Sequence, residues 1–136
     1  MVWEGEGMTL HIVMAWYNRL PPVERDLPIL ILDGIAYTPN MVLAEVMRGS
    51  IVGERLQRLI EEGRLGNSRL EEEQLAKIRL KELLRRYPEK PLVAILREGR
   101  IFTPSQLIEE IERGTPVGRM LVISEIEYMR FLLRLR

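Results

Sequence analysis

The sequence has no Cys and only one His, His11, among its 136 residues. The absence of Cys excludes disulfides, thiolate metal sites and Cys nucleophiles. A His-based catalytic site or metal site would have to be built on His11 alone, and we interpret His11 as a half-exposed structural residue. The composition therefore predicts no enzyme activity, no metal site and no cofactor.

Long hydrophobic runs are also absent. No apolar stretch reaches the roughly 18 residues that a membrane-spanning helix requires. The first seven residues carry two Glu and no basic residue, which is unlike a signal peptide. We therefore expect a cytoplasmic protein that does not contact a membrane.

The chain carries no excess of either charge, with 20 basic and 20 acidic residues. Nucleic-acid binding usually depends on a basic excess, so a protein partner or a second copy ranks ahead of nucleic acid. Zero net charge also weakens the repulsion between copies. The 17 Arg against 3 Lys, and 18 Glu against 2 Asp, are typical of the ion pairs of a thermophile. A GC-rich genome would give the same Arg bias, and both explanations stay open.

The clearest positive feature is an internal repeat. Residues 30–55 align without a gap with residues 95–120, and 8 of the 26 aligned positions are identical. The identities fall at residues that start or stop local structure. Such a repeat predicts two copies of one supersecondary unit.

Each copy begins with a predicted hairpin followed by a helix. Asp33-Gly34 and Glu98-Gly99 separate short apolar runs, and Gly supplies the positive φ of a tight turn. A Thr-Pro pair then follows in both copies, at residues 38–39 and 103–104. Thr caps free N–H groups, and Pro at the first helical position loses no hydrogen bond. Gln106 completes a capping box with the Thr of the second copy.

A two-residue corner then leads into a second helix in each copy. The corner sequences are RGSIVG and RGTPVG, in which Gly ends one helix and Ser or Thr caps the next. Arg48 and Arg113 stand beside the new helix N-termini, where an anion could bind. We name these two residues as a candidate anion site. The end of one helix and the start of the next explain both sequences without a ligand. Tyr37 and Phe102, at matched strand ends, are interpreted as core residues.

The remaining segments connect the copies. In residues 8–17 large apolar side chains occupy every second position, which favours a strand. Residues 19–28 contain three Pro and are predicted to form an extended linker. The second helix of the first copy is expected over residues 51–62. A linking helix is expected over residues 68–87, with a capping box at its start and Tyr87 on its apolar side.

The last predicted helix covers residues 120–135, and 11 of its 16 residues are apolar. This is more than a surface helix needs for the single apolar stripe that packs against the core. Either it lies at the centre of the fold, or part of it contacts another chain, and we favour contact. The candidate interaction surface consists of Tyr128, Phe131, Leu132 and Leu135.

Together these patterns predict one α+β domain over residues 1–136. Two tandem β-hairpin–helix–helix units, related by a pseudo-twofold axis, would share one antiparallel sheet with five helices on one face. An N-terminal strand and the linking helix complete the predicted fold.

The leading functional hypothesis is a non-enzymatic interaction module: a homo-oligomer, an adaptor or a regulatory subunit. The first alternative is a small nucleic-acid-binding regulator, because helix–corner–helix pairs occur twice. The second is a small-anion or ligand-binding protein with its site between the repeats, where Arg48 would meet Arg113.

Overall fold

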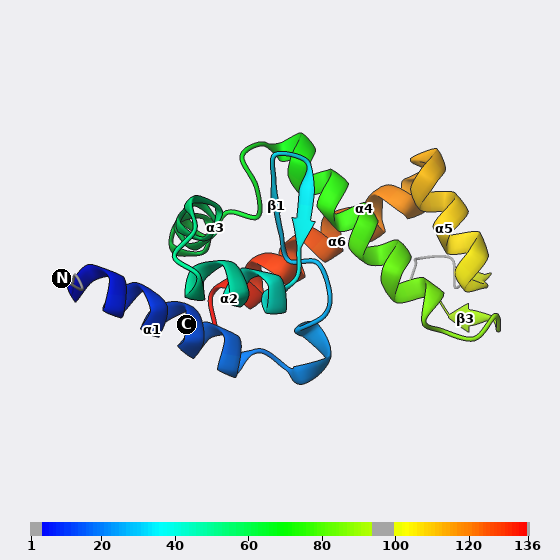
Figure 1. Cartoon of the computed structure of the whole chain (residues 1–136). Helices are drawn as coiled ribbons and strands as arrows, with labels where there is room; N and C mark the ends of the chain where they lie inside the picture. The colour runs from blue at the N-terminus through cyan, green and yellow to red at the C-terminus, as the bar shows by residue number, and fades with distance from the viewer. Residues whose placement is uncertain (1–3, 94–99, 136) are drawn as a thin grey trace.

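The computed structural model describes residues 4–93 and 100–135, and it has the mixed helix-and-strand composition of the α+β class (Figure 1). Figure 1 shows α2 and α3 on one side of the molecule and α5 on the other, with α4 and α6 running between them. The elements in chain order are α1 (Glu4–Arg19), the 3-10 turn η1 (Pro22–Glu24), β1 (Leu30–Leu32), β2 (Ile35–Tyr37), α2 (Pro39–Met47), α3 (Ile51–Glu62), α4 (Arg69–Arg85), β3 (Leu92–Val93), β4 (Ile101–Phe102), α5 (Pro104–Arg113) and α6 (Pro116–Leu133).

The first hairpin forms as the sequence predicts. Strands β1 and β2 pair antiparallel, with Leu32 opposite Ile35. Asp33 and Gly34 make the two-residue turn with φ values of 52° and 79°. Positive φ at both positions is the conformation that suits the right-handed twist of a hairpin, and it explains the Asp-Gly pair.

The prediction of one shared sheet is wrong. Strands β1–β2 and β3–β4 form two separate two-stranded sheets. The outer edge of β1 is already occupied, because the Ile31 N–H donates to the carbonyl of Leu65 over 2.8 Å. A second hairpin therefore cannot add to β1 at that position.

The second hairpin also differs in register from the first. The repeat predicts Ile95 as the partner of Phe102, but Phe102 pairs with Leu92. The connection between β3 and β4 is therefore longer than a two-residue turn. The predicted turn at Glu98-Gly99 lies outside the described residues.

Both Thr-Pro pairs start helices as predicted. Thr38 and Thr103 have nearly equal backbone angles, with φ near −82° and ψ of 161°, and each hydroxyl accepts the N–H three residues later at 3.2 Å. The capping box in α5 is also present, because the Gln106 side chain accepts the Thr103 N–H at 2.9 Å. Helices α2 and α5 therefore begin by the same local rule.

The two corners also share one geometry. Gly49 and Gly114 both have a φ of 66°, which ends the preceding helix in the left-handed region. Ser50 and Thr115 then cap the next helix, accepting the N–H three residues later at 2.9 and 3.2 Å. Each corner thus ends one helix and starts the next within two residues.

A second glycine in each copy allows the paired helices to approach closely. A Cβ on Gly53 would lie 2.4 Å from the carbonyl oxygen of Glu45. A Cβ on Gly118 would lie 2.1 Å from the carbonyl oxygen of Glu110. Both distances are far below van der Waals contact, so these positions require Gly for packing.

The predicted N-terminal strand is wrong, because residues 8–17 lie within α1. Val13, Trp16 and Leu20 are buried at helical spacing, and the Trp16 indole N–H donates to the carbonyl of Leu132 over 2.9 Å. This contact joins α1 to the end of α6 and satisfies both polar groups in the core. Six α-helices therefore occupy residues 4–93 and 100–135, where five were expected.

The Pro-rich segment 19–28 is not fully extended, because η1 forms within it and Leu20 and Leu27 are buried. Helix α3 has the predicted bounds. Helix α4 begins after its predicted cap, Ser68, and ends two residues short of the expectation, leaving Tyr87 exposed rather than on a buried side. Tyr37 and Phe102 are core residues, as interpreted from the sequence.

Candidate interaction site

The outer face of α6 exposes four large apolar side chains. Met120 is 47% exposed, Ile123 54%, Tyr128 40% and Phe131 52%. Their spacing of three, five and three residues keeps them on one side of a helix with 3.6 residues per turn. We call these four residues the α6 outer face. Grouped exposure of this kind is typical of a contact surface.

Of the four residues predicted for this surface, two are exposed and two pack against the core. Tyr128 and Phe131 are exposed, with ring centroids 6.3 Å apart and planes at 25°. Leu132 is wrongly assigned, because it is 1% exposed and belongs to the core beneath Trp16. Leu135 is half-buried and packs against the core. Helical spacing counted back from Phe131 would have identified Met120 and Ile123.

Tyr128 connects this surface to the interior. Its hydroxyl donates to a carboxylate oxygen of Glu24 over 3.2 Å. Burial raises the pKa of the Tyr128 phenol above its ordinary value of 10.0, and the negative charge of Glu24 raises this pKa further. The hydroxyl therefore stays protonated and remains a donor at neutral pH.

A buried arginine lies below Tyr128. Arg79 on α4 is 1% exposed, and its guanidinium donates to Glu24, to Glu125 and, at 3.1 Å, to the carbonyl of Pro28. It also lies under the Tyr128 ring, 5.8 Å from the centroid. The network joins η1, α4 and α6, and it holds α6 in place from within. No local pattern in the sequence distinguishes Arg79 from the exposed Arg residues of α4.

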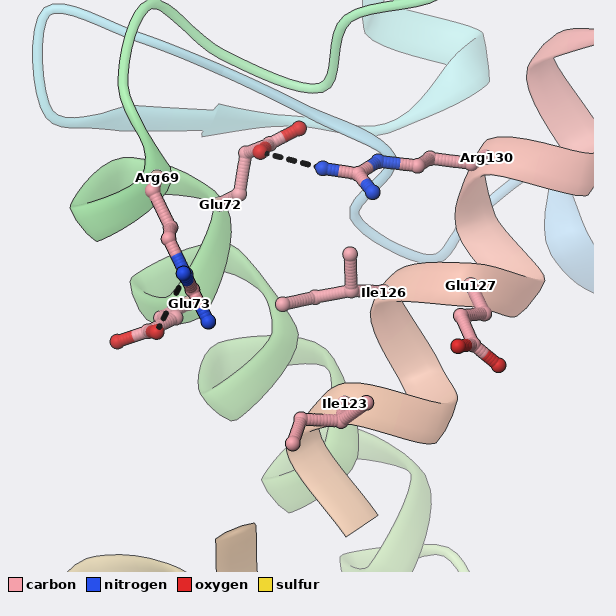
Figure 2. Close-up of a pocket in the computed structure, with 7 residues that line it drawn as sticks. All are labelled: Arg69, Glu72, Glu73, Ile123, Ile126, Glu127 and Arg130. Carbon is pink, nitrogen blue, oxygen red and sulfur yellow. Dashed lines mark hydrogen bonds and ion pairs between the residues drawn. The ribbon is translucent and has the colours of Figure 1, made fainter. Parts of the chain in front are cut away.

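A hollow of about 290 Å³ lies beside the outer face, between α4 and α6 (Figure 2). Figure 2 shows Ile123 and Ile126 projecting from α6 toward α4. Charged pairs border them, with Arg130 to Glu72 at 2.8 Å and Arg69 to Glu73 at 3.5 Å. The hollow thus has an apolar centre and a rim of mostly paired charges.

A second hollow of about 280 Å³ adjoins the first and shares Arg69, Glu73 and Ile123 with it. It lies at the corner between α5 and α6, against α4. Its other lining residues are Lys77, Ile111, Gly114, Gly118, Arg119 and Val122.

The candidate anion site does not form between the units. Arg48 pairs with Glu45 at the α2–α3 corner, and Arg113 pairs with Glu109 at 3.5 Å on α5. Figure 1 shows α2 and α5 on opposite sides of α4 and α6. Each guanidinium therefore neutralises a carboxylate of its own helix, and the two do not meet.

The Arg48–Glu45 pair leads to a pH prediction. The hydrogen bond from Arg48, followed by the hydrogen bond from Ser50, holds the pKa of Glu45 below its ordinary value of 4.5. A carboxyl whose pKa is lower in the folded state stabilises the fold above the unfolded pKa, and this contribution is lost as pH falls through the folded pKa. We expect Arg48→Gln to raise the Glu45 pKa toward the ordinary value, as measured by NMR titration of the side-chain carboxyl. Arg113→Gln is the matched control, and an unchanged Glu45 pKa in Arg48→Gln would contradict the assigned cause.

His11 is the remaining residue considered as a candidate from the sequence. His11 is exposed on α1 and lines a shallow hollow with Ile12, Ala15 and Arg19. Within the described part of the chain, no three His, Asp or Glu residues cluster closely enough to hold a metal ion. None of the helices in residues 4–93 and 100–135 combines the length and apolar character needed to cross a bilayer.

Comparison with known proteins finds one partial likeness and no family. No family model matches the sequence, and no solved structure matches it. A Drosophila melanogaster protein named "Probable cytochrome P450 310a1" is 35% identical over 96 residues, which is 67% of this chain. The chain spans only 20% of the fly protein's length, and this likeness does not establish a shared family.

Proposed function

We propose that this chain is a non-enzymatic interaction module, a small cytoplasmic adaptor or regulatory subunit, which associates with a second copy of itself through α6. The observation that carries the proposal is the α6 outer face. Four large apolar side chains lie in water along one helix, although the chain has a full core elsewhere. Covering them would release the free energy of apolar burial, about 25 cal/mol for each Å² removed from water.

The order of residues on this face supports an antiparallel pair of identical helices. If two α6 helices cross between Glu125 and Ile126, Met120 faces the partner's Phe131, and Ile123 and Tyr128 lie at the two edges of the contact. The same contacts occur twice, as twofold symmetry requires. A surface that maps onto itself in this way is suited to a homodimer.

The charges on this face are compatible with the same arrangement. The positions between the apolar residues are Ser124 and Glu127, and each would face the other across the helix pair. A Ser hydroxyl can donate to a carboxylate, and no two like charges meet. The zero net charge of the chain adds little long-range repulsion between copies.

We expect the protein to be dimeric at micromolar concentrations and Phe131→Glu to be monomeric. Each dimer loses two buried Phe contacts, so the dissociation constant should rise about a hundredfold or more. Analytical ultracentrifugation across a concentration series measures this change. Ile51→Glu is the matched control, because Ile51 is exposed at the start of α3, away from the outer face. It should leave the dimer intact.

A second variant tests the proposed register. Met120→Lys should also weaken the dimer, but Phe131→Glu combined with Met120→Lys should restore it, because Lys and Glu then face each other twice. A wild-type chain that stays monomeric at the highest soluble concentration would overturn the self-association proposal. Failure of the double variant to recover would exclude the antiparallel register.

The fly protein's name does not lead us to propose haem chemistry. A Cys thiolate holds the haem iron in P450 enzymes. This chain has no Cys, so it cannot supply that ligand. We retain the non-enzymatic proposal.

We also propose that residues 30–55 and 95–120 are tandem copies of one ancestral unit. The matching caps and corners, and the close-packed glycines at the same offset, support this origin. The separate sheets and the different register of the second hairpin limit the likeness to the helical part of each unit.

A further inference from the structure

The second hollow, at the α5–α6 corner, combines an apolar floor with a positively charged rim. Ile111, Val122 and Ile123 form the floor, where Ile111 and Val122 are buried and Ile123 is partly exposed. Gly114 and Gly118 line the corner and contribute backbone without side chains. Most of the apolar surface that a ligand could cover here belongs to Ile123, which is 54% exposed.

The rim of this hollow carries a net positive charge. Four charged residues line this hollow: Arg69, Lys77 and Arg119 are basic, and Glu73 is acidic. Arg69 and Glu73 pair with each other at 3.5 Å. Lys77 and Arg119 therefore leave two positive charges facing one small apolar hollow. The N-terminus of the 18-residue helix α6 adds positive potential at the same end.

The adjoining hollow of Figure 2 has a different charge balance. Its two Arg residues are both paired with carboxylates, and Glu127 adds one negative charge. Its centre contains Ile123 and Ile126. An anionic group is thus favoured at the Lys77 end, and an apolar chain is favoured along the isoleucines. The two hollows, of about 280 and 290 Å³, are at the small end of the range for ligand pockets.

We propose that this groove binds a medium-chain carboxylic acid. The carboxylate lies between Lys77 and Arg119, and the alkyl chain lies over Val122 and Ile123 toward Ile126. A carboxylate accepts charge-assisted hydrogen bonds from both cations, and the alkyl chain covers apolar surface that is otherwise in contact with water. This site is separate from the anion site expected between the units. It shares Ile123 with the α6 outer face, so the alkyl chain and a second copy of the chain would compete for that side chain.

Titration with sodium octanoate, followed by NMR at the backbone amides of Gly114, Gly118 and Arg119, tests the proposal. Octanoate should bind saturably, while acetate and octan-1-ol should each bind about tenfold more weakly, because each lacks one of the two contacts. Equal binding of octan-1-ol would overturn the role of the cations. Equal binding of acetate would overturn the role of the floor.

Variants identify the site. Lys77→Gln combined with Arg119→Gln should weaken octanoate binding about tenfold, to the level of octan-1-ol. Arg58→Gln, at an exposed cation on α3, is the control and should bind like the wild type. Unchanged binding in the double variant would overturn the proposal. The titration is repeated in Phe131→Glu, where retained binding separates this site from self-association.

Discussion

Replacement of Arg79 by Met lowers the free energy of unfolding by about 3–5 kcal/mol, the range typical of breaking a buried ion pair from one side. Arg79 is 1% exposed and hydrogen bonds two carboxylates, so its loss leaves Glu24 and Glu125 without a counter-charge. Met fills a similar volume, and the expected loss therefore reflects charge rather than a cavity. Arg79 also positions Glu24, which accepts the hydrogen bond of the Tyr128 hydroxyl, so this hydrogen bond is weakened as well.

Urea denaturation measures this loss, with Arg86→Met as the matched control. Arg86 lies at the end of the same helix, but its contacts with Asp26 and Glu82 are exposed and longer, at 3.5 and 3.7 Å. Exposed pairs contribute roughly 0–1 kcal/mol, so this control should unfold nearly like the wild type. Adding Glu24→Gln and Glu125→Gln to Arg79→Met should recover part of the loss. Equal stability of Arg79→Met and Arg86→Met would refute the role of the buried network.

Replacement of Gly118 by Ala destabilises the protein by about 2–3 kcal/mol, against the usual effect of this substitution. In a helix interior, Gly→Ala normally stabilises by about 1 kcal/mol. At Gly118 the new Cβ would lie 2.1 Å from a backbone carbonyl of α5, and backbone cannot rotate away as a side chain can. The two-residue corner prevents α5 and α6 from sliding apart, so the overlap persists.

Thermal or urea unfolding checks the sign of this effect. Gln74 is exposed inside α4, and Gln74→Ala should be more stable than Gln74→Gly by about 0.5–1 kcal/mol, as intrinsic propensity predicts. Gly53→Ala should follow Gly118→Ala, because its Cβ would also overlap backbone. Stabilisation by Gly118→Ala would show that the two helices can separate without cost.

The sequence predicts the helix starts and tight turns well, because their physics is local. Thr38 and Ser68 each cap an N–H group three residues away, and the Asp33-Gly34 turn depends on two backbone conformations. Such interactions need no information about the rest of the fold. The same local character explains why the bounds of α3 could be read from the sequence.

Residues 8–17 could not be assigned from the sequence, because their apolar residues fit both periods. Alternation selects Leu10, Ile12, Met14 and Trp16, whereas helical spacing groups Trp16 with Val13. The second pattern wins because Trp16 packs against α6, more than a hundred residues away. A tertiary contact of this kind overrides the local pattern, and it cannot be recognised from a short segment of the sequence.

The candidate site was predictable only in part. The surplus of apolar residues in α6 indicates a surface beyond the core, and Tyr128 and Phe131 are on it. The helix rotation that buries Leu132 instead depends on where α1 and α4 dock. The burial of Arg79 could not be predicted from the sequence, because only its contacts with Glu24 and Glu125 make its charge tolerable in the interior.

The hydrogen bond between Trp16 and Leu132 spans 116 positions of the chain. Helix α1 also contacts α2, but the Leu132 carbonyl that accepts the Trp16 N–H belongs to α6, so this hydrogen bond cannot form until α6 has docked. Closing so long a loop is also slow, because chain entropy is lost before the contact forms. We therefore expect the hydrogen bond of the Trp16 indole to be among the last contacts to form during folding.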